Sequence, residues 1–248
     1  MSQPKIIAQM VGHNEANKYL PEVLKRLKSQ VDEIVFTDDC SDDNTAEMAS
    51  EYATVYKTPV RLKYKEILQP KPMFTVNEGR LRRFAWLNLE NHATEGDWII
   101  AIDCDEMLYD ASDITKTDIR QILNSSEKDV VNVRFYHMWN NAQYRVDKLW
   151  APNPSSRIFR FMSGAMFRDK ALACGSEPTY VTHLINQRNY FVNSNLIMQH
   201  LGYIKDEDKQ SKYERYSTLD GGEFHELNHI NSIVDPNPVL INWGNFGI

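Results

Sequence analysis

The sequence predicts an α/β fold in which a mostly parallel central sheet is flanked by helices and is followed by a second half richer in strands. Two observations support this prediction. In residues 1–109, apolar runs of strand length alternate with segments whose apolar side chains recur at helical spacing, which is typical of a doubly wound parallel sheet. In residues 110–248, strand-like runs follow one another with little helix between them. We expect one domain whose halves, 1–109 and 110–248, serve different parts of the function.

The first half begins with the apolar run Lys5–Val11, which is predicted to be a buried strand. Asn17–Ser29 follows, with its apolar side chains on one helix face. The other elements predicted here are strands at Val31–Thr37, Thr54–Tyr56, Val60–Ile67 and Asp97–Ile102, and helices from Asp43 or Asn44 to about Tyr52 and over Gly79–His92. This alternation implies parallel strands covered by helices.

The second half is predicted to contain more strands than helices. Alternating or apolar runs indicate strands at Val130–Trp139, Gln143–Trp150, Arg157–Met162 and Tyr190–Met198. A polar helix is predicted over Asp206–Leu219. We find no internal repeat that would divide this half further.

Composition narrows the function classes. The chain has 248 residues, of which 42% are hydrophobic and 25% charged, as in ordinary globular proteins. The net charge of −6 argues against a dedicated nucleic-acid binder, because such proteins usually carry a basic excess. The three cysteines show no spacing typical of a zinc site. No apolar run approaches the roughly 20 residues of a membrane span and no signal peptide is recognised, so we expect a cytoplasmic protein.

Acidic side chains follow three predicted strands at the point where each strand ends. The first strand leads into Glu15, the second into Asp38 and Asp39, and the third into Asp103 and Asp105. In a parallel sheet these ends meet at one edge, where ligands of open α/β folds bind. An extended strand would point Asp103 and Asp105 to the same side. Solvated turns would explain any one cluster about equally well, but several clusters in one sheet favour a bound Mg²⁺ or Mn²⁺.

Three segments resemble the family 2 glycosyltransferases in the order in which that family carries them. They are VGHNEANKYLPEVLKRL, VDEIVFTDDCSDDNTAEMA and GDWIIAIDCDEML, the last containing the Asp-x-Asp motif. The resemblance covers about the first 110 residues and implies a GT-A fold, which is Rossmann-like. It further implies transfer of a sugar from a nucleotide-diphosphate donor, typically a UDP-sugar, with Mn²⁺ or Mg²⁺ and inversion at the anomeric carbon.

The resemblance also assigns site residues. Those that it places beside the nucleotide sugar are Val11, His13, Glu15, Asp39 (or its neighbour Asp38), Arg80, Arg83 and Asp103. Asp39 is expected to accept a hydrogen bond from the base, and Asp103 to approach the ribose or the metal. Asp105 is expected to ligate the metal directly, and His200 to complete the metal shell or touch the diphosphate. His13 replaces a common tyrosine, and Cys40 stands where glycine is usual, so that turn is expected to differ.

The two predicted diphosphate ligands lie on the helix of the GRLRRFAWL segment. Arg80 and Arg83 are one turn apart there, and their guanidinium groups suit phosphate oxygens. For Arg82, a solvated position on the protein surface is nearly as well supported as a position facing the diphosphate. On the acceptor side, Glu177 is the candidate base that deprotonates the acceptor hydroxyl.

The acceptor itself is not identified by the sequence. Trp139, Trp150 and the Arg157–Phe161 segment are expected to line its site because aromatic faces suit sugars, although core packing would also explain the tryptophans. A saccharide, a lipid-linked glycan, a protein and a modified nucleic-acid base all stay open. The sequence gives no indication of the oligomeric state.

Other functions compete with this interpretation. A nucleotidyltransferase would also use carboxylates and Mg²⁺ on an α/β sheet, but it usually has a glycine-rich first loop, and here only Gly12 is present. His225, Glu226 and His229 form H-E-x-x-H, the helical motif of zinc peptidases. Nearby prolines and the short remaining chain argue against that motif. A binding protein without turnover is a third alternative, which the intact Asp103 and Asp105 pair disfavours.

Overall fold

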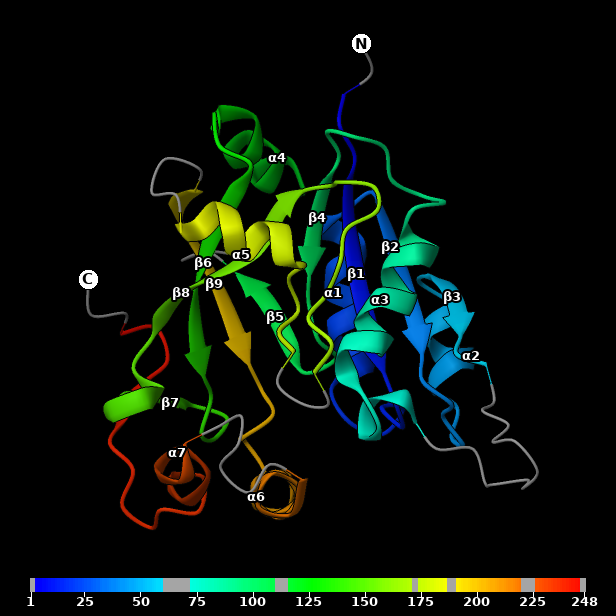
Figure 1. Ribbon diagram of the computed structural model, residues 1–248. Coiled ribbons are helices and arrows are strands. Elements are labelled where there is room, and N and C mark those ends of the chain that lie inside the picture. Colours follow the sequence, from blue (N-terminus) through cyan, green and yellow to red (C-terminus); the bar gives the residue numbers. More distant parts are fainter. Residues whose placement is uncertain are drawn as a thin grey trace, which may run out of the picture.

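A single eight-stranded sheet forms the centre of the computed structural model, which describes residues 3–59, 72–109, 116–170, 174–186, 191–219 and 226–245. The strands lie in the order β3-β2-β1-β4-β8-β6-β9-β5, with helices on both faces (Figure 1). Their bounds are β1 Ile6–Gly12, β2 Glu33–Asp38, β3 Thr54–Lys57, β4 Trp98–Ala101, β5 Glu106–Tyr109, β6 Val130–His137, β8 Asn153–Arg160 and β9 Phe191–His200. Strands β7 (Gln143–Arg145) and β10 (Leu240–Asn242) form a separate antiparallel pair.

The half of the sheet formed by β3, β2, β1 and β4 is parallel throughout, as the sequence predicts. Beyond β4 the sheet is mixed: β8 runs antiparallel to β4 and β6, and β6 is parallel to β9. The carboxyl ends of β1, β2 and β4 therefore share one edge. This arrangement confirms the predicted α/β class with a strand-rich second half.

The helices form where the apolar spacing predicts them in the first half. Helix α1 (Leu20–Gln30) buries the predicted apolar face and begins later than expected, because Pro21 occupies its first turn. Helices α2 (Thr45–Ser50) and α3 (Glu78–Leu89) also match their predicted segments closely. The predicted strand Val60–Ile67 lies outside the described residues.

The faces of the sheet are covered by different helices (Figure 1). Apolar residues of α1 and of α4 (Lys116–Ser125) form one core cluster with the strands. Residues of α3 and of α5 (Thr179–Asn186) form the second cluster on the opposite face. The sequence analysis missed α4, α5 and β5. Within the described ranges, no helix is long and apolar enough to cross a membrane.

A third core cluster attaches helix α6 (Asp206–Leu219), which was predicted with these bounds, to the strand ends. Trp139 and Trp150 are only 5% and 1% exposed, and Trp139 stacks on Tyr203 with ring centroids 5.4 Å apart. The expectation that the two tryptophans line an acceptor site is therefore wrong: they pack in a core that supports α6.

Arg145 stabilises the same region through buried contacts. Its side chain is fully buried, with its guanidinium carbon 4.5 Å from the centre of the Trp139 ring. It donates hydrogen bonds to the Asp147 carboxylate and to the carbonyl oxygen of Ser232, and it lies 3.3 Å from Asp235. Ser232 is the last residue of α7 (Leu227–Ser232), so one buried guanidinium joins β7 to the C-terminal segment.

Candidate functional site

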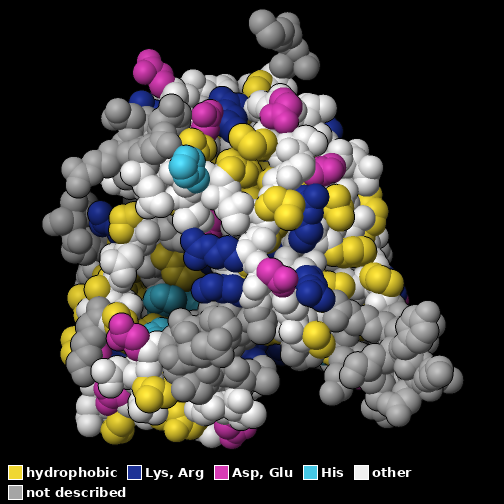
Figure 2. All heavy atoms as spheres, viewed as in Figure 1, with side chains coloured by type: hydrophobic (Ala, Val, Ile, Leu, Met, Phe, Trp, Pro, Cys, Tyr) yellow, Lys and Arg dark blue, Asp and Glu magenta, His cyan; other side chains and the backbone are white. Residues whose placement is uncertain are grey.

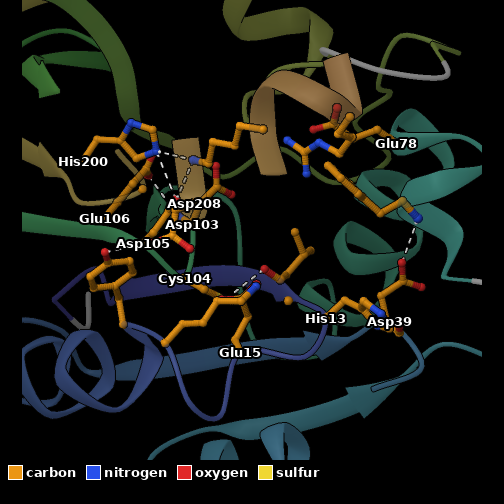
Figure 3. A pocket seen from close by; sticks show the side chains of 18 of the residues that line it. His13, Glu15, Asp39, Glu78, Asp103, Cys104, Asp105, Glu106, His200 and Asp208 are labelled. Atoms are coloured by element: carbon orange, nitrogen blue, oxygen red, sulfur yellow. Dashed lines mark hydrogen bonds and ion pairs between the residues drawn. The ribbon is translucent and has the colours of Figure 1, made fainter. Parts of the chain in front are cut away.

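A cavity of about 580 Å³ opens at the carboxyl ends of β1 and β4 and is walled on the far side by α6. Figure 2 shows basic and histidine side chains beside a hollow on this face of the molecule. Of the residues predicted for the site, those that line the cavity are Val11, His13, Glu15, Asp39, Asp103, Asp105 and His200. The structure thus brings the three strand-end clusters into one shared space, in which His13 and Asp39 lie at one end and Asp105 and His200 at the other (Figure 3).

Asp39 organises the first end of the cavity. Its buried carboxylate accepts hydrogen bonds from the Thr58 hydroxyl (2.9 Å) and from the backbone N–H groups of Met73 (2.8 Å) and Phe74 (2.7 Å). These bonds hold the short helix η1 (Met73–Thr75) against the end of β2, so that Phe74 lines the cavity. His13 Nδ1 lies 2.9 Å from the carbonyl oxygen of Asp39.

The turn after Asp39 keeps the conformation that glycine would provide. Cys40 has a φ of 57°, in the left-handed region that side-chain-bearing residues rarely enter. Its sulfur lies 3.2 Å from the Thr58 hydroxyl oxygen. The expectation that this turn differs from that of relatives with glycine stays a prediction.

Asp103 is held by two arginines in the middle of the cavity. Its Oδ1 accepts a hydrogen bond from Arg82 Nη1 at 3.0 Å, and its Oδ2 lies 3.9 Å from Arg157 Nη1. The same arginines pair with Glu78 (3.2 Å) and Glu106 (2.7 Å). Burial alone would raise the pKa of Asp103, but the two guanidinium groups lower it below its usual value.

Glu106 belongs to the same network and is only 2% exposed. Burial raises its pKa to about 8 against the opposing charge of Arg157, and the Asp103 and Asp105 carboxylates act in the same direction as burial. Its second oxygen accepts a hydrogen bond from the backbone N–H of Asp103 at 2.9 Å. The four-residue span therefore folds back on itself.

Asp105 faces a different set of partners. Its Oδ2 lies 3.2 Å from His200 Nε2 and 3.0 Å from the ammonium nitrogen of Lys212 on α6. Strand pairing places His200 here, because β5 and β9 align Glu106 with His200. Burial would raise the pKa of Asp105, yet Lys212 and His200 bring it well below its ordinary value. Asp105 is therefore ionised.

His200 is supported from behind by His137 on β6. Their Nδ1 atoms are 2.9 Å apart, so one ring donates a hydrogen bond to the other. Burial lowers the pKa of both rings, well below the usual value for His137. Both imidazoles are therefore neutral near pH 7, which is the form that binds metal ions.

Asp103 and Asp105 point to different partners because the chain is not extended between them. Strand β4 ends at Ala101, and residues 103–105 form a turn in which Glu106 N donates to the carbonyl oxygen of Asp103 at 3.1 Å. The expectation that both carboxylates lie on the same side of a strand is therefore wrong. Across the described ranges, no three His, Cys, Asp or Glu side chains are grouped closely enough to bind a metal ion by themselves.

Arg80, Arg83 and Glu177 were predicted for the site but do not line the cavity. Arg80 is exposed and lies 3.6 Å from Asp169, and Arg83 donates to the carbonyl oxygen of Ala165. Arg82, for which a surface position was considered, is 8% exposed and lines the cavity instead. Glu177 is also absent from the lining.

The sequence analysis missed several cavity residues, including His137, Lys212 and Phe74. Of the cavity residues that the sequence analysis did not assign, only Arg82 could have been identified from a sequence pattern. It is four residues after Glu78 and three before the buried Ala85, which places it on the buried face of α3.

The H-E-x-x-H segment does not form the helix that a zinc peptidase needs. Helix α7 starts at Leu227, and Glu226 precedes it with φ −60° and ψ 138°. His229 stacks on Trp150 with ring centroids 4.8 Å apart, and His225 lies outside the described residues. Because helix α7 begins after Glu226, the described part of the segment does not have the helical arrangement that this alternative needs.

Comparisons with known proteins agree with the family and the fold. The pattern of glycosyl transferase family 2 matches residues 10–175, and a search of curated proteins finds no match. The mannosyltransferase PcManGT from Pyrobaculum calidifontis, solved with GDP-Man and Mn²⁺, is 13% identical with a TM-score of 0.50, over 88% of this chain and 62% of that one. TarS 1–349 from S. aureus, solved with UDP, is 16% identical with a TM-score of 0.48, over 92% and 69%.

The family match covers more than half of the chain and includes all three segments that carry the resemblance seen in the sequence. The α/β architecture, with its parallel first half and strand-rich second half, is the GT-A type that this resemblance implies. The chain therefore belongs to glycosyl transferase family 2 and is a glycosyltransferase.

Proposed function

We propose that this glycosyltransferase moves a sugar from a nucleotide-diphosphate donor to an acceptor hydroxyl with the help of a divalent metal ion. The observation that carries the proposal is the meeting of Asp39, Asp105 and His200 in one cavity at the strand ends. Asp39 and Phe74 line one end of that cavity and Asp105 lines the other, which suits a ligand with a base at one end and phosphates at the other.

The base and ribose are assigned to the end formed by β1 and β2. Val11, His13 and Asp39 line it, and Phe74 offers an aromatic face there. The hydrogen bonds that Asp39 receives fix its carboxylate in place before any ligand binds. We favour uracil as the base because of the resemblance noted in the sequence, and TarS was solved with UDP. PcManGT was solved with GDP-Man, which makes GDP-sugars the first alternative to test.

The diphosphate and the metal ion are assigned to the other end. A carboxylate oxygen and a neutral imidazole nitrogen form a donor set suited to Mn²⁺, and Asp105 Oδ2 and His200 Nε2 are 3.2 Å apart. Because the described residues supply only these two ligands together, phosphate oxygens and water would complete the shell. A bound ion would neutralise the charge that develops on the departing diphosphate.

The reaction would form a bond between the acceptor oxygen and the anomeric carbon while the bond from that carbon to the diphosphate oxygen breaks. The chain contributes fixed positive charge for the leaving group through Arg82 and Arg157, whose orientation is set by Asp103, Glu78 and Glu106. The resemblance favours inversion. We assign no base, because Glu177 does not line the cavity.

A thermal-shift screen of UDP-sugars and GDP-sugars, each with and without Mn²⁺, tests the proposal. A ligand that binds only the folded protein raises Tm by mass action. We expect one nucleotide sugar to raise Tm strongly with Mn²⁺ and only weakly without it. If no nucleotide sugar shifts Tm under either condition, the donor assignment is wrong.

A further inference from the structure

We propose that Lys212 is a tethered cation that fills the place of the divalent ion between Asp105 and His200, so that metal binding must displace it. This inference rests on the proposed function in one respect, namely that Asp105 and His200 hold the metal. It adds a role for a residue of α6 that the family resemblance did not assign.

The distances around Lys212 support this role. Its Nζ lies 3.0 Å from Asp105 Oδ2 and 3.3 Å from His200 Nε2. Those two atoms are 3.2 Å apart, close to the spacing of about 3.0 Å for neighbouring ligands of an octahedral ion with bonds of about 2.1 Å. The ammonium therefore contacts the same two atoms that would ligate the ion.

His200 Nε2 faces the Lys212 ammonium at 3.3 Å. Its Nδ1 faces His137 Nδ1 at 2.9 Å. When His200 donates from Nδ1, its Nε2 is an acceptor, and the Lys212 ammonium has the protons to donate to it. The same lone pair would bind a metal ion, so the two cations compete for it.

Neighbouring groups leave little space for a second cation. A Cβ atom built on Gly202 would lie 2.1 Å from both Asp105 Oδ2 and Lys212 Nζ, so the backbone of Gly202 closes one side. The Tyr203 ring lies 4.5 Å from Nζ on the same stretch of chain. Lys212 is only 18% exposed. The ammonium is thus held in a partly enclosed place.

The charges at the site predict how Lys212 and a divalent ion affect each other's binding to Asp105. In the metal-free protein, Lys212 compensates the half-buried Asp105 carboxylate, which would otherwise be costly to hold ionised. An incoming divalent ion must replace this contact and also tolerate the nearby ammonium. Removing the ammonium therefore removes a competitor while leaving both proposed metal ligands in place.

Titration of the full chain with Mn²⁺ alone, by calorimetry or by electron paramagnetic resonance, tests this inference without a donor or an acceptor. We expect Lys212→Met to bind Mn²⁺ about tenfold more tightly than the wild type, or better. Lys212→Gln, which can still donate to Asp105 and so protects against misfolding, should also bind more tightly. The matched control is Lys209→Met, because Lys209 pairs with Asp206 on the same helix and does not line the cavity.

Unchanged or weaker Mn²⁺ affinity in both Lys212 variants would overturn the inference, as would tighter binding in Lys209→Met. If none of the proteins binds Mn²⁺, the inference is also overturned, and the thermal-shift screen then decides separately whether nucleotide sugars bind. Tighter Mn²⁺ binding in the Lys212 variants with no response to any nucleotide sugar would support the cation competition and reject the donor assignment.

Discussion

Asp103 and Asp105 belong to the same short motif but contact different side chains. Asp103 faces the arginines Arg82 and Arg157, which are themselves held by other carboxylates. Asp105 faces His200 and the ammonium of Lys212. The first carboxylate is built into a network of charges, whereas the second contacts one imidazole and one ammonium, and we propose that another cation can replace that ammonium.

This difference teaches that an Asp-x-Asp motif need not present two equivalent metal ligands. The turn over residues 103–105 rotates the two carboxylates apart. We infer that Asp103 positions the arginines for the diphosphate and that Asp105 holds the ion. The following experiments test this division, beginning with the largest expected effect.

Replacing each aspartate by asparagine should separate the two roles. We expect Asp105→Asn to lower the transfer rate by about a thousandfold and to abolish Mn²⁺ binding, because the ion loses its charged ligand. Asp103→Asn should keep measurable Mn²⁺ binding in calorimetry. Loss of Mn²⁺ binding in Asp103→Asn would mean that both carboxylates ligate the ion and would remove the contrast.

Arg82→Met should destabilise the protein more than it alters metal binding. The substitution leaves Glu78 buried without its ion-pair partner and leaves Asp103 with the more distant Arg157 and the Ser176 hydroxyl, and breaking such a network costs about 3 kcal/mol. Urea unfolding measures the free energy change. The matched control is Arg80→Met on the exposed side of the same helix, which should stay within about 0.5 kcal/mol of the wild type. Equal effects from the two substitutions would show that the network is not structural.

The His137 and His200 pair should make stability depend on pH with a smaller amplitude. Burial holds the pKa of His137 well below its value in the unfolded chain. Between pH 7.5 and 5.5 the unfolded chain therefore binds protons that the folded protein does not, so the free energy of unfolding falls as the pH is lowered, by about 1 kcal/mol per histidine. Urea unfolding at several pH values measures this slope.

His137→Gln should reduce that pH dependence. A slope that is the same in His137→Gln and in the wild type would mean that the ring is protonated in the folded protein. His200 would then lack the neutral partner that orients it toward Asp105.

The sequence predicted the first half of the fold and the strand-end carboxylates because both depend on local patterns. A carboxylate that follows an apolar strand lies at the sheet edge whatever the rest of the chain does, which is why Asp39 and Asp105 were found. His200 was found only through the family resemblance. The predicted diphosphate ligands illustrate a different failure: the face of α3 was assigned from arginine spacing, when the buried stripe through Glu78 and Ala85 identifies Arg82.

Lys212 and His137 could not be predicted in this way. Lys212 reaches Asp105 from a residue 107 positions away, and it does so only because the cluster formed by Trp139, Trp150 and Tyr203 attaches α6 to the strand ends. Periodicity does not show which elements pack together at such separations. The tryptophans were assigned to an acceptor site for the same reason, since their burial depends on a helix whose position the sequence does not give.

Through its buried guanidinium, Arg145 makes the Asp105 end of the cavity depend on a segment that is distant in the sequence. Its partners Ser232 and Asp235 belong to the stretch after α6. A proteolytic cut or premature stop between α6 and Asp235 would leave this guanidinium with Asp147 as its remaining partner and loosen the wall that carries Lys212. We expect such a shortened chain to lose its cation site even though every residue that lines the cavity is still present.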